Sequence, residues 1–88
     1  MIATLVTVYG RVQGVWYRAT THETAQKIGV CGWVRNRPDG AVEAHIEGEP
    51  APVQQLIDWM HSGPPLAHVE RMETMPAQVE NFTDFSVR

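Results

Sequence analysis

Residues 30–48, VCGWVRNRPDGAVEAHIEG, decide the fold of this chain. Residues 30–36 are rich in β-branched and aromatic side chains, and the Pro-Asp-Gly segment at 38–40 has the composition of a tight turn. In residues 41–48, apolar and polar side chains alternate, which predicts a strand with one buried and one solvated face. We therefore expect a β-hairpin with Val42, Ala44 and Ile46 on the buried face and Glu43, His45 and Glu47 on the solvated face.

A strand and a helix are expected before this hairpin. Residues 2–9, IATLVTVY, have a strand composition, and residues 17–28 show helical spacing of the side chains that share one face, which are Tyr17, Thr21, Ala25 and Ile28. Thr20 and Glu23 are spaced like a capping box that would begin the helix later. We favour the start at Tyr17, because a loop that binds phosphate through its backbone normally runs directly into the helix that follows it. Gly29 is suited to the left-handed C-cap.

A second helix and two further strands are expected after the hairpin. Pro52 opens the helix, the Gly-Pro-Pro segment at 63–65 ends it, and its apolar stripe consists of Val53, Leu56, Ile57 and Met60. Residues 67–75 and 82–87 read as strands, and the core residues expected in the second are Phe82, Phe85 and Val87.

The predicted fold class is α+β. The order is βαββαβ with a short extra strand, and both helices must cover the same sheet face to form one core. This predicts a ferredoxin-like sandwich, an antiparallel sheet covered on one face by two helices, in a single domain spanning residues 1–88.

Composition narrows the classes of function. The net charge of −3 argues against a dedicated nucleic-acid-binding protein, which usually has a basic face. The single cysteine excludes an internal disulfide framework. We see no signal peptide and no apolar run long enough to cross a membrane. The expectation is a monomer in the cytoplasm.

The loop before the first helix, GRVQGVWYR at residues 10–18, has the features of an anion site. Glycines allow successive backbone N–H groups to point inward, and a helix N-terminus adds partial positive charge. Arg18 falls in the first helical turn, where its forked donors can close on the same anion, while Val12 and Val15 would fix the loop to the core. The alternative is an ordinary glycine-bearing connection with a surface arginine.

Asn36 is the second candidate, at the end of the strand GWVRN. Its neutral amide offers a donor and an acceptor, which suits it to orienting a water molecule. An asparagine before a turn can also simply bond its own backbone.

Together, GRVQGVWYR and GWVRNRPDGAVEAHIEG closely resemble the acylphosphatases, and the resemblance runs from about Thr7 to Arg88. It implies a ferredoxin-like fold that hydrolyses carboxyl-phosphate anhydrides without a cofactor or metal. It also implies that Arg18 binds the phosphate and that Asn36 positions the attacking water. The backbone N–H groups that would form the phosphate cradle belong to Gln13, Gly14, Val15, Trp16, Tyr17 and Arg18.

The chain departs from the commoner family pattern at Trp16, Tyr17 and Arg37, which affects the expected substrate shape and affinity. The chemistry itself is consistent with what the residues offer. An acyl phosphate expels a carboxylate, a good leaving group that needs no general acid, so positioning and charge stabilisation can suffice. Inorganic phosphate, the product, and sulfate are the expected inhibitors.

Other functions remain open from the sequence. Cys31 and Arg37 have the C-x5-R spacing of cysteine-dependent phosphatases, which need the cysteine in a loop before a helix. We expect Cys31 instead to be a small buried residue. The spacings of His22, His45, His61 and His68 match no common metal-ligand pair, and His45 is expected to be solvated.

Binding modules are the remaining alternatives. RNA-recognition domains share this order of elements, but the strand AVEAHIEG has no aromatic residue for base stacking, and Glu43 and Glu47 would repel a phosphate backbone. A non-catalytic module that binds phosphate or acyl phosphate could use the same cradle. Turnover of an acyl phosphate distinguishes it from an enzyme.

Overall fold

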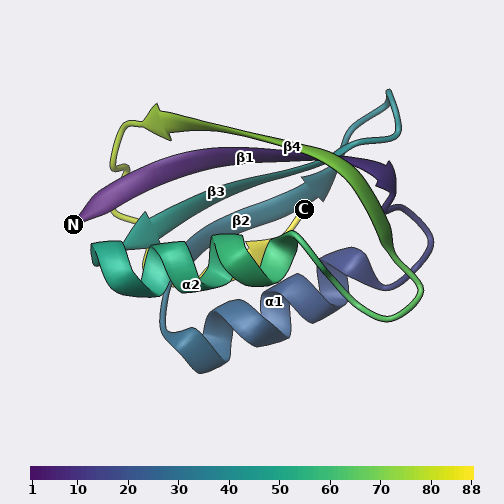
Figure 1. Cartoon of the computed structure of the whole chain (residues 1–88). Helices are drawn as coiled ribbons and strands as arrows, with labels where there is room; N and C mark the ends of the chain where they lie inside the picture. Colours follow the sequence, from purple (N-terminus) through teal and green to yellow (C-terminus); the bar gives the residue numbers. More distant parts are fainter.

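The computed structural model describes all residues from 1 to 88 and places two helices on one face of a five-stranded sheet (Figure 1). In chain order, the elements are β1 (Ile2–Arg11), α1 (Tyr17–Ile28), β2 (Cys31–Asn36), β3 (Val42–Gly48), α2 (Pro50–Met60), β4 (His68–Ala77) and β5 (Phe85–Val87). The strand order is β4-β1-β3-β2-β5, and every pair is antiparallel except the parallel pair β2 and β5. The predicted ferredoxin-like α+β fold is confirmed, but the sheet is mixed and not wholly antiparallel as expected, because the short extra strand β5 pairs in parallel with β2.

The hydrophobic core lies between the sheet and the two helices. The alternation in residues 41–48 places Val42, Ala44 and Ile46 in this core, each with no exposed surface. The predicted stripe of α2 faces them, and its members Val53, Leu56, Ile57 and Met60 are all buried. Burying one such aliphatic side chain contributes about 1.5–3 kcal/mol, so this layer accounts for much of the stability.

Several predicted boundaries are wrong. Strand β4 spans His68–Ala77, where residues 67–75 were expected. Helix α2 begins at Pro50, not at Pro52, because proline is tolerated throughout a first helical turn. Strand β1 continues to Arg11. Strand β5 has only three residues and starts at Phe85. Consequently, of the three core residues expected there, only Phe85 is in the core: Val87 on this edge strand is 44% exposed, and Phe82 lies outside the core cluster.

The prediction that His45 and Glu47 lie on a solvated face of β3 is also wrong, because these residues are only 3% and 1% exposed. Residues 78–84 cover these side chains on the face of the sheet opposite the helices. The Glu47 carboxylate accepts hydrogen bonds from the backbone N–H groups of Glu80 and Phe82 and contacts His45 Nε2 at 2.9 Å. Burial alone would raise the pKa of Glu47, but these hydrogen bonds hold it below its ordinary value.

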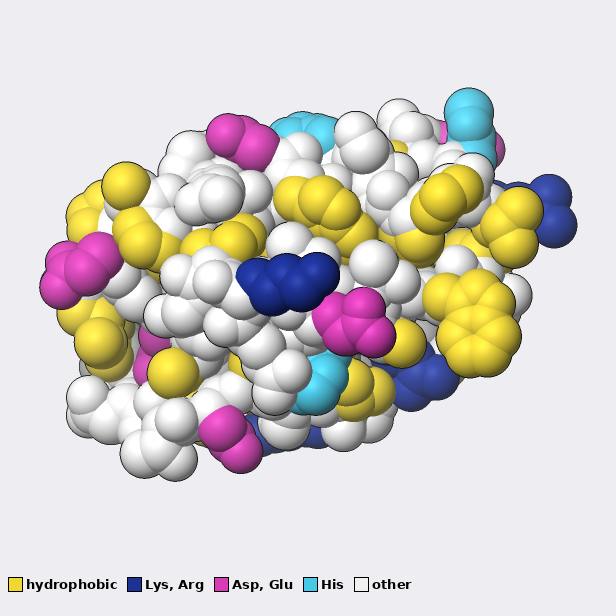
Figure 2. Space-filling model, turned by 90° about the horizontal axis from the view of Figure 1, so that it is seen from below, with side chains coloured by type: hydrophobic (Ala, Val, Ile, Leu, Met, Phe, Trp, Pro, Cys, Tyr) yellow, Lys and Arg dark blue, Asp and Glu magenta, His cyan; other side chains and the backbone are white.

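The side of the molecule on which the helices lie carries charged groups that are scattered among hydrophobic side chains, and Lys and Arg form no continuous patch there (Figure 2). None of the helices combines the length and the apolar character that crossing a membrane requires.

Candidate active site

The loop between β1 and α1 begins at an irregularity in the sheet. The register of β1 against β4 shifts between Tyr9 and Gly10. Gly10 has φ of +127°, and a Cβ atom there would lie 2.3 Å from the carbonyl oxygen of His68, so glycine is required. Val12 and Val15, 1% and 4% exposed, then fix the loop to the core as predicted.

The loop presents unpaired backbone donors. The N–H groups of residues 13–16 donate no hydrogen bond to any backbone or side-chain acceptor of the chain. Gly14 and Trp16 both have left-handed conformations, with φ of 73° and 68°. Such backbone curls form anion-binding concavities. Helix α1 follows at once, with no side-chain cap and no acidic residue in its first turn, so its N-terminal charge is not neutralised.

The start of α1 is set as expected. Thr20 lies inside the helix, where its hydroxyl donates to the carbonyl oxygen of Trp16 at 2.8 Å, so the later start is excluded. The buried Tyr17 hydroxyl donates to the carbonyl of Met60 at 2.6 Å, and its ring lies 6.0 Å from that of Trp59. Burial raises the pKa of Tyr17, and the residue acts as a neutral anchor between the two helices.

Arg18 contacts Arg88, the residue that follows strand β5. Its Nη1 donates to the carbonyl oxygen of Arg88 at 3.2 Å, and the N–H of Arg88 donates to the carbonyl of Val34 on β2 at 2.8 Å. Arg88 therefore helps to position the guanidinium beside the loop. The sequence reading missed this contact, because no local pattern links two residues so far apart.

Asn36 meets Arg18 and the loop at one hollow of about 360 Å³. The side-chain oxygen of Asn36 is buried and has no hydrogen-bond partner. No hydrogen bond to this oxygen therefore fixes the orientation of the amide relative to the hollow. The lining residues are Val12, Gly14, Trp16, Tyr17, Arg18, Ala19, Asn36 and Val87. Arg18 and Asn36, predicted from separate segments, are thus brought together.

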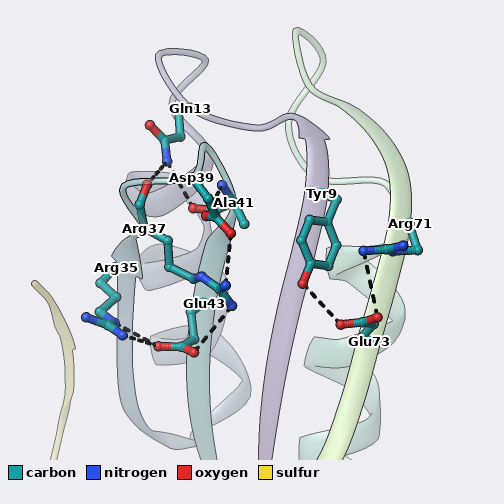
Figure 3. A network of polar contacts seen from close by, with 9 residues as sticks. All are labelled: Tyr9, Gln13, Arg35, Arg37, Asp39, Ala41, Glu43, Arg71 and Glu73. Carbon is teal, nitrogen blue, oxygen red and sulfur yellow. Dashed lines mark hydrogen bonds and ion pairs between the residues drawn. The ribbon is translucent and has the colours of Figure 1, made fainter.

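The Gln13 side chain connects the loop to the turn between β2 and β3 (Figure 3). Its Nε2 donates to the carbonyl oxygens of Arg37 and Ala41, at 2.8 and 3.0 Å. The Arg37 guanidinium pairs with Asp39 at 2.9 Å and with Glu43 at 3.8 Å and does not line the hollow. The Arg37 guanidinium is therefore already engaged in ion pairs with Asp39 and Glu43. The two hydrogen bonds of the Gln13 side chain hold the loop beside the end of β2.

The structure excludes the alternative catalytic site at Cys31. Cys31 is half-buried, not buried as expected, and it begins the extended strand β2, not a loop before a helix. At ~3.3 Å per residue, the five steps to Asn36 separate it from the hollow by about 17 Å. The histidines do not assemble either: no group of three His, Cys, Asp or Glu side chains is placed to hold a metal ion.

A larger hollow of about 670 Å³ lies on the face opposite the helices, and Asn36 borders it as well. It contains no part of the loop, and Arg35 in it is already paired with Glu43 at 2.7 Å. Of the two hollows, only the smaller is lined by Arg18 and by residues of the loop, so it is the candidate active site.

Comparisons with known proteins define the class. The family model for acylphosphatase matches residues 4–87. An acylphosphatase of Gloeobacter violaceus is 56% identical over 82 residues, 93% of this chain and 88% of that protein. One of Thermococcus kodakarensis is 54% identical over 80 residues, 91% and 88% of the two chains. The crystal structure of acylphosphatase from Bacillus subtilis has a TM-score of 0.97 at 32% identity, covering 100% of this chain and 99% of that one.

The fold and the comparisons together define a small acylphosphatase-like protein. The chain belongs to the acylphosphatase family. It is an enzyme that hydrolyses acyl phosphates, small molecules in which a carboxylate and a phosphate are joined as an anhydride. The predicted class is confirmed, and a purely non-catalytic module is set aside.

Proposed function

We propose that the backbone N–H groups of residues 13–18 and the guanidinium of Arg18 bind the phosphoryl group of the substrate. The support is that these N–H groups have no competing acceptor at residues 13–16 and that Arg18 lines the same hollow. Backbone donors and an arginine fork match the three phosphoryl oxygens and neutralise the charge that develops on them.

Asn36 orients the attacking water in this proposal. Its amide oxygen accepts a hydrogen bond from the water and leaves the water's lone pair directed at phosphorus. The new bond joins the water oxygen to phosphorus as the bond from phosphorus to the acyl oxygen breaks. The carboxylate leaves with that electron pair, and the water's proton passes to solvent. The leaving group needs no proton, so no general acid is assigned.

The observation that carries this assignment is the meeting of Arg18, the unpaired loop and Asn36, whose buried side-chain oxygen has no partner, at one hollow. Arg18 is pre-positioned by Arg88 and the loop by Gln13, so little reorganisation is needed when substrate binds. Inorganic phosphate, the product, and sulfate compete for the same donors. We propose further that the enzyme works as a monomer in the cytoplasm, a reducing compartment that suits its single unpaired cysteine.

Titration with inorganic phosphate, followed through backbone amide signals by NMR, tests the cradle. The signals of residues 13–18 should move most, with the same dissociation constant as the competitive inhibition constant of phosphate. The Arg18→Ala variant should need a much higher phosphate concentration for the same shifts. Shifts centred on Cys31 or on residues of the larger hollow would overturn the assignment.

A further inference from the structure

The exposed position of the Trp16 side chain is explained neither by its backbone conformation nor by packing in the core. It is 74% exposed although it is the largest residue type, and it takes no part in the core cluster. Its φ of 68° is left-handed, which is uncommon for any side chain and strained for a bulky one. Glycine would fit this backbone better, as Gly14 does two residues earlier with φ of 73°.

The side chains of the two neighbouring loop residues lie in different surroundings. Val15 is 4% exposed and Trp16 is 74% exposed. Exposure alone does not say what the indole contacts. What distinguishes Trp16 is that it lines the hollow that also contains Arg18 and Asn36.

The hollow has both polar and apolar lining residues. In the proposed function, the phosphoryl group binds at the backbone donors, Arg18 and Asn36. Five of the eight lining residues are hydrophobic, namely Val12, Trp16, Tyr17, Ala19 and Val87. Val12 and Tyr17 are about 1% exposed, so the accessible apolar surface comes from Trp16, from the 44%-exposed Val87 and from the small side chain of the exposed Ala19. A volume of about 360 Å³ falls in the range of small-molecule sites, roughly 300–1,000 Å³.

We propose that the indole of Trp16 packs against the acyl group of the substrate and makes the enzyme prefer acyl phosphates with a flat apolar acyl group, aromatic above all. This inference rests on the proposed phosphate site, because a phosphate held at the N–H groups of residues 13–18 leaves its acyl group at the mouth beside Trp16. Stacked or edge-on aromatic pairs are favourable beyond the area that they bury. Val87 is the other exposed large hydrophobic residue that lines the hollow.

The test compares two substrates that share the reacting group and differ in the acyl group, benzoyl phosphate and acetyl phosphate. The readout is the ratio of their kcat/KM values in wild type and in the Trp16→Ala, Trp16→Gly and Trp16→Phe variants. We expect the ratio to fall about 3- to 10-fold for alanine and glycine and to stay near wild type for phenylalanine. Glycine relieves the left-handed strain, so a folding defect in the alanine variant does not remove the test.

Leu66→Ala is the matched control, since Leu66 is 65% exposed and lies outside the hollow. It should leave the ratio unchanged. Equal losses with both substrates in Trp16→Gly would show that Trp16 only shapes the loop, and an unchanged ratio would show that it does not touch the acyl group; either result overturns the inference. Failure of the phosphate site itself would show differently, as full activity of Arg18→Ala on both substrates.

Discussion

Arg18 donates a hydrogen bond through Nη1 to the carbonyl oxygen of Arg88, 3.2 Å away and 70 positions along the chain. A guanidinium has five N–H donors, so this contact fixes the side chain and leaves further donors for a phosphoryl group. Arg88, just beyond the edge strand β5, thereby contributes to a site that is otherwise built from the loop, α1 and β2.

Arg18→Lys is expected to lose most of the activity. A lysine ammonium is a compact point charge and cannot hold Arg88 and two phosphoryl oxygens in one plane as a guanidinium does. We expect kcat/KM to fall by on the order of 10²-fold or more for lysine and up to ~10³-fold for alanine. Steady-state hydrolysis of benzoyl phosphate measures this, with Arg71→Lys on the exposed face of β4 as the control. Near wild-type activity of Arg18→Lys would contradict the cradle.

Gln13→Ala should loosen the loop from the turn between β2 and β3. The two hydrogen bonds to the carbonyls of Arg37 and Ala41 are lost, each worth ~0.5–1.5 kcal/mol. Phosphate inhibition should weaken several-fold, and the melting temperature should fall. The control is Gln54→Ala, which removes a side-chain contact from an exposed face of α2. If both variants bind phosphate like wild type, the bridge does not position the loop.

Cys31→Ser is expected to retain the rate of hydrolysis. The thiol lies at the far end of β2 from Asn36 and its loss affects only packing. Activity toward benzoyl phosphate and a thermal melt should be recorded on the same sample. Complete loss of activity in a folded Cys31→Ser variant would require a phosphocysteine mechanism instead.

Glu47→Gln should destabilise the protein in a pH-dependent way. The pKa of Glu47 is lower in the folded protein than its ordinary value of 4.5, so the carboxylate stabilises the fold above that pH and the contribution is lost as the pH falls. We expect urea unfolding to show a deficit of ~1–3 kcal/mol at pH 7 that shrinks towards pH 3. The exposed control Glu23→Gln should show little deficit. A deficit of constant size across this range would mean that the charge of Glu47 does not matter.

Local patterns predicted much of the fold. The start of α1 at Tyr17, its end at Gly29 and the buried stripe of α2 all follow from spacing within a few residues. The alternation in β3 correctly identified the core side. It failed on the other side, because residues 78–84 return from a distant part of the chain to cover His45 and Glu47.

For the candidate site, too, local motifs predicted some residues but not the distant contacts that support them. Arg18 and Asn36 could be named from two short motifs, and the structure brings them to one hollow. Their supports could not be named: the carbonyl of Arg88 and the side chain of Gln13 act across long sequence separations. No spacing rule encodes a contact between a residue in the first helical turn and one beyond the last strand.

In the proposed mechanism, the backbone N–H groups and Arg18 bind phosphate, and Asn36 positions the water. Asn36→Ala separates the two functions, since it removes the amide and leaves the backbone donors and Arg18 in place. Asn36→Asp is the companion, because its negative charge should repel phosphate and damage binding and turnover together.

The most direct measurement is kcat for benzoyl phosphate together with the inhibition constant of inorganic phosphate in Asn36→Ala, beside a thermal melt. We predict that kcat falls ~10²-fold or more, while the inhibition constant changes little and the protein stays folded. A wild-type kcat with an unchanged melt would contradict the account, since Asn36 would then not be the residue that positions the water.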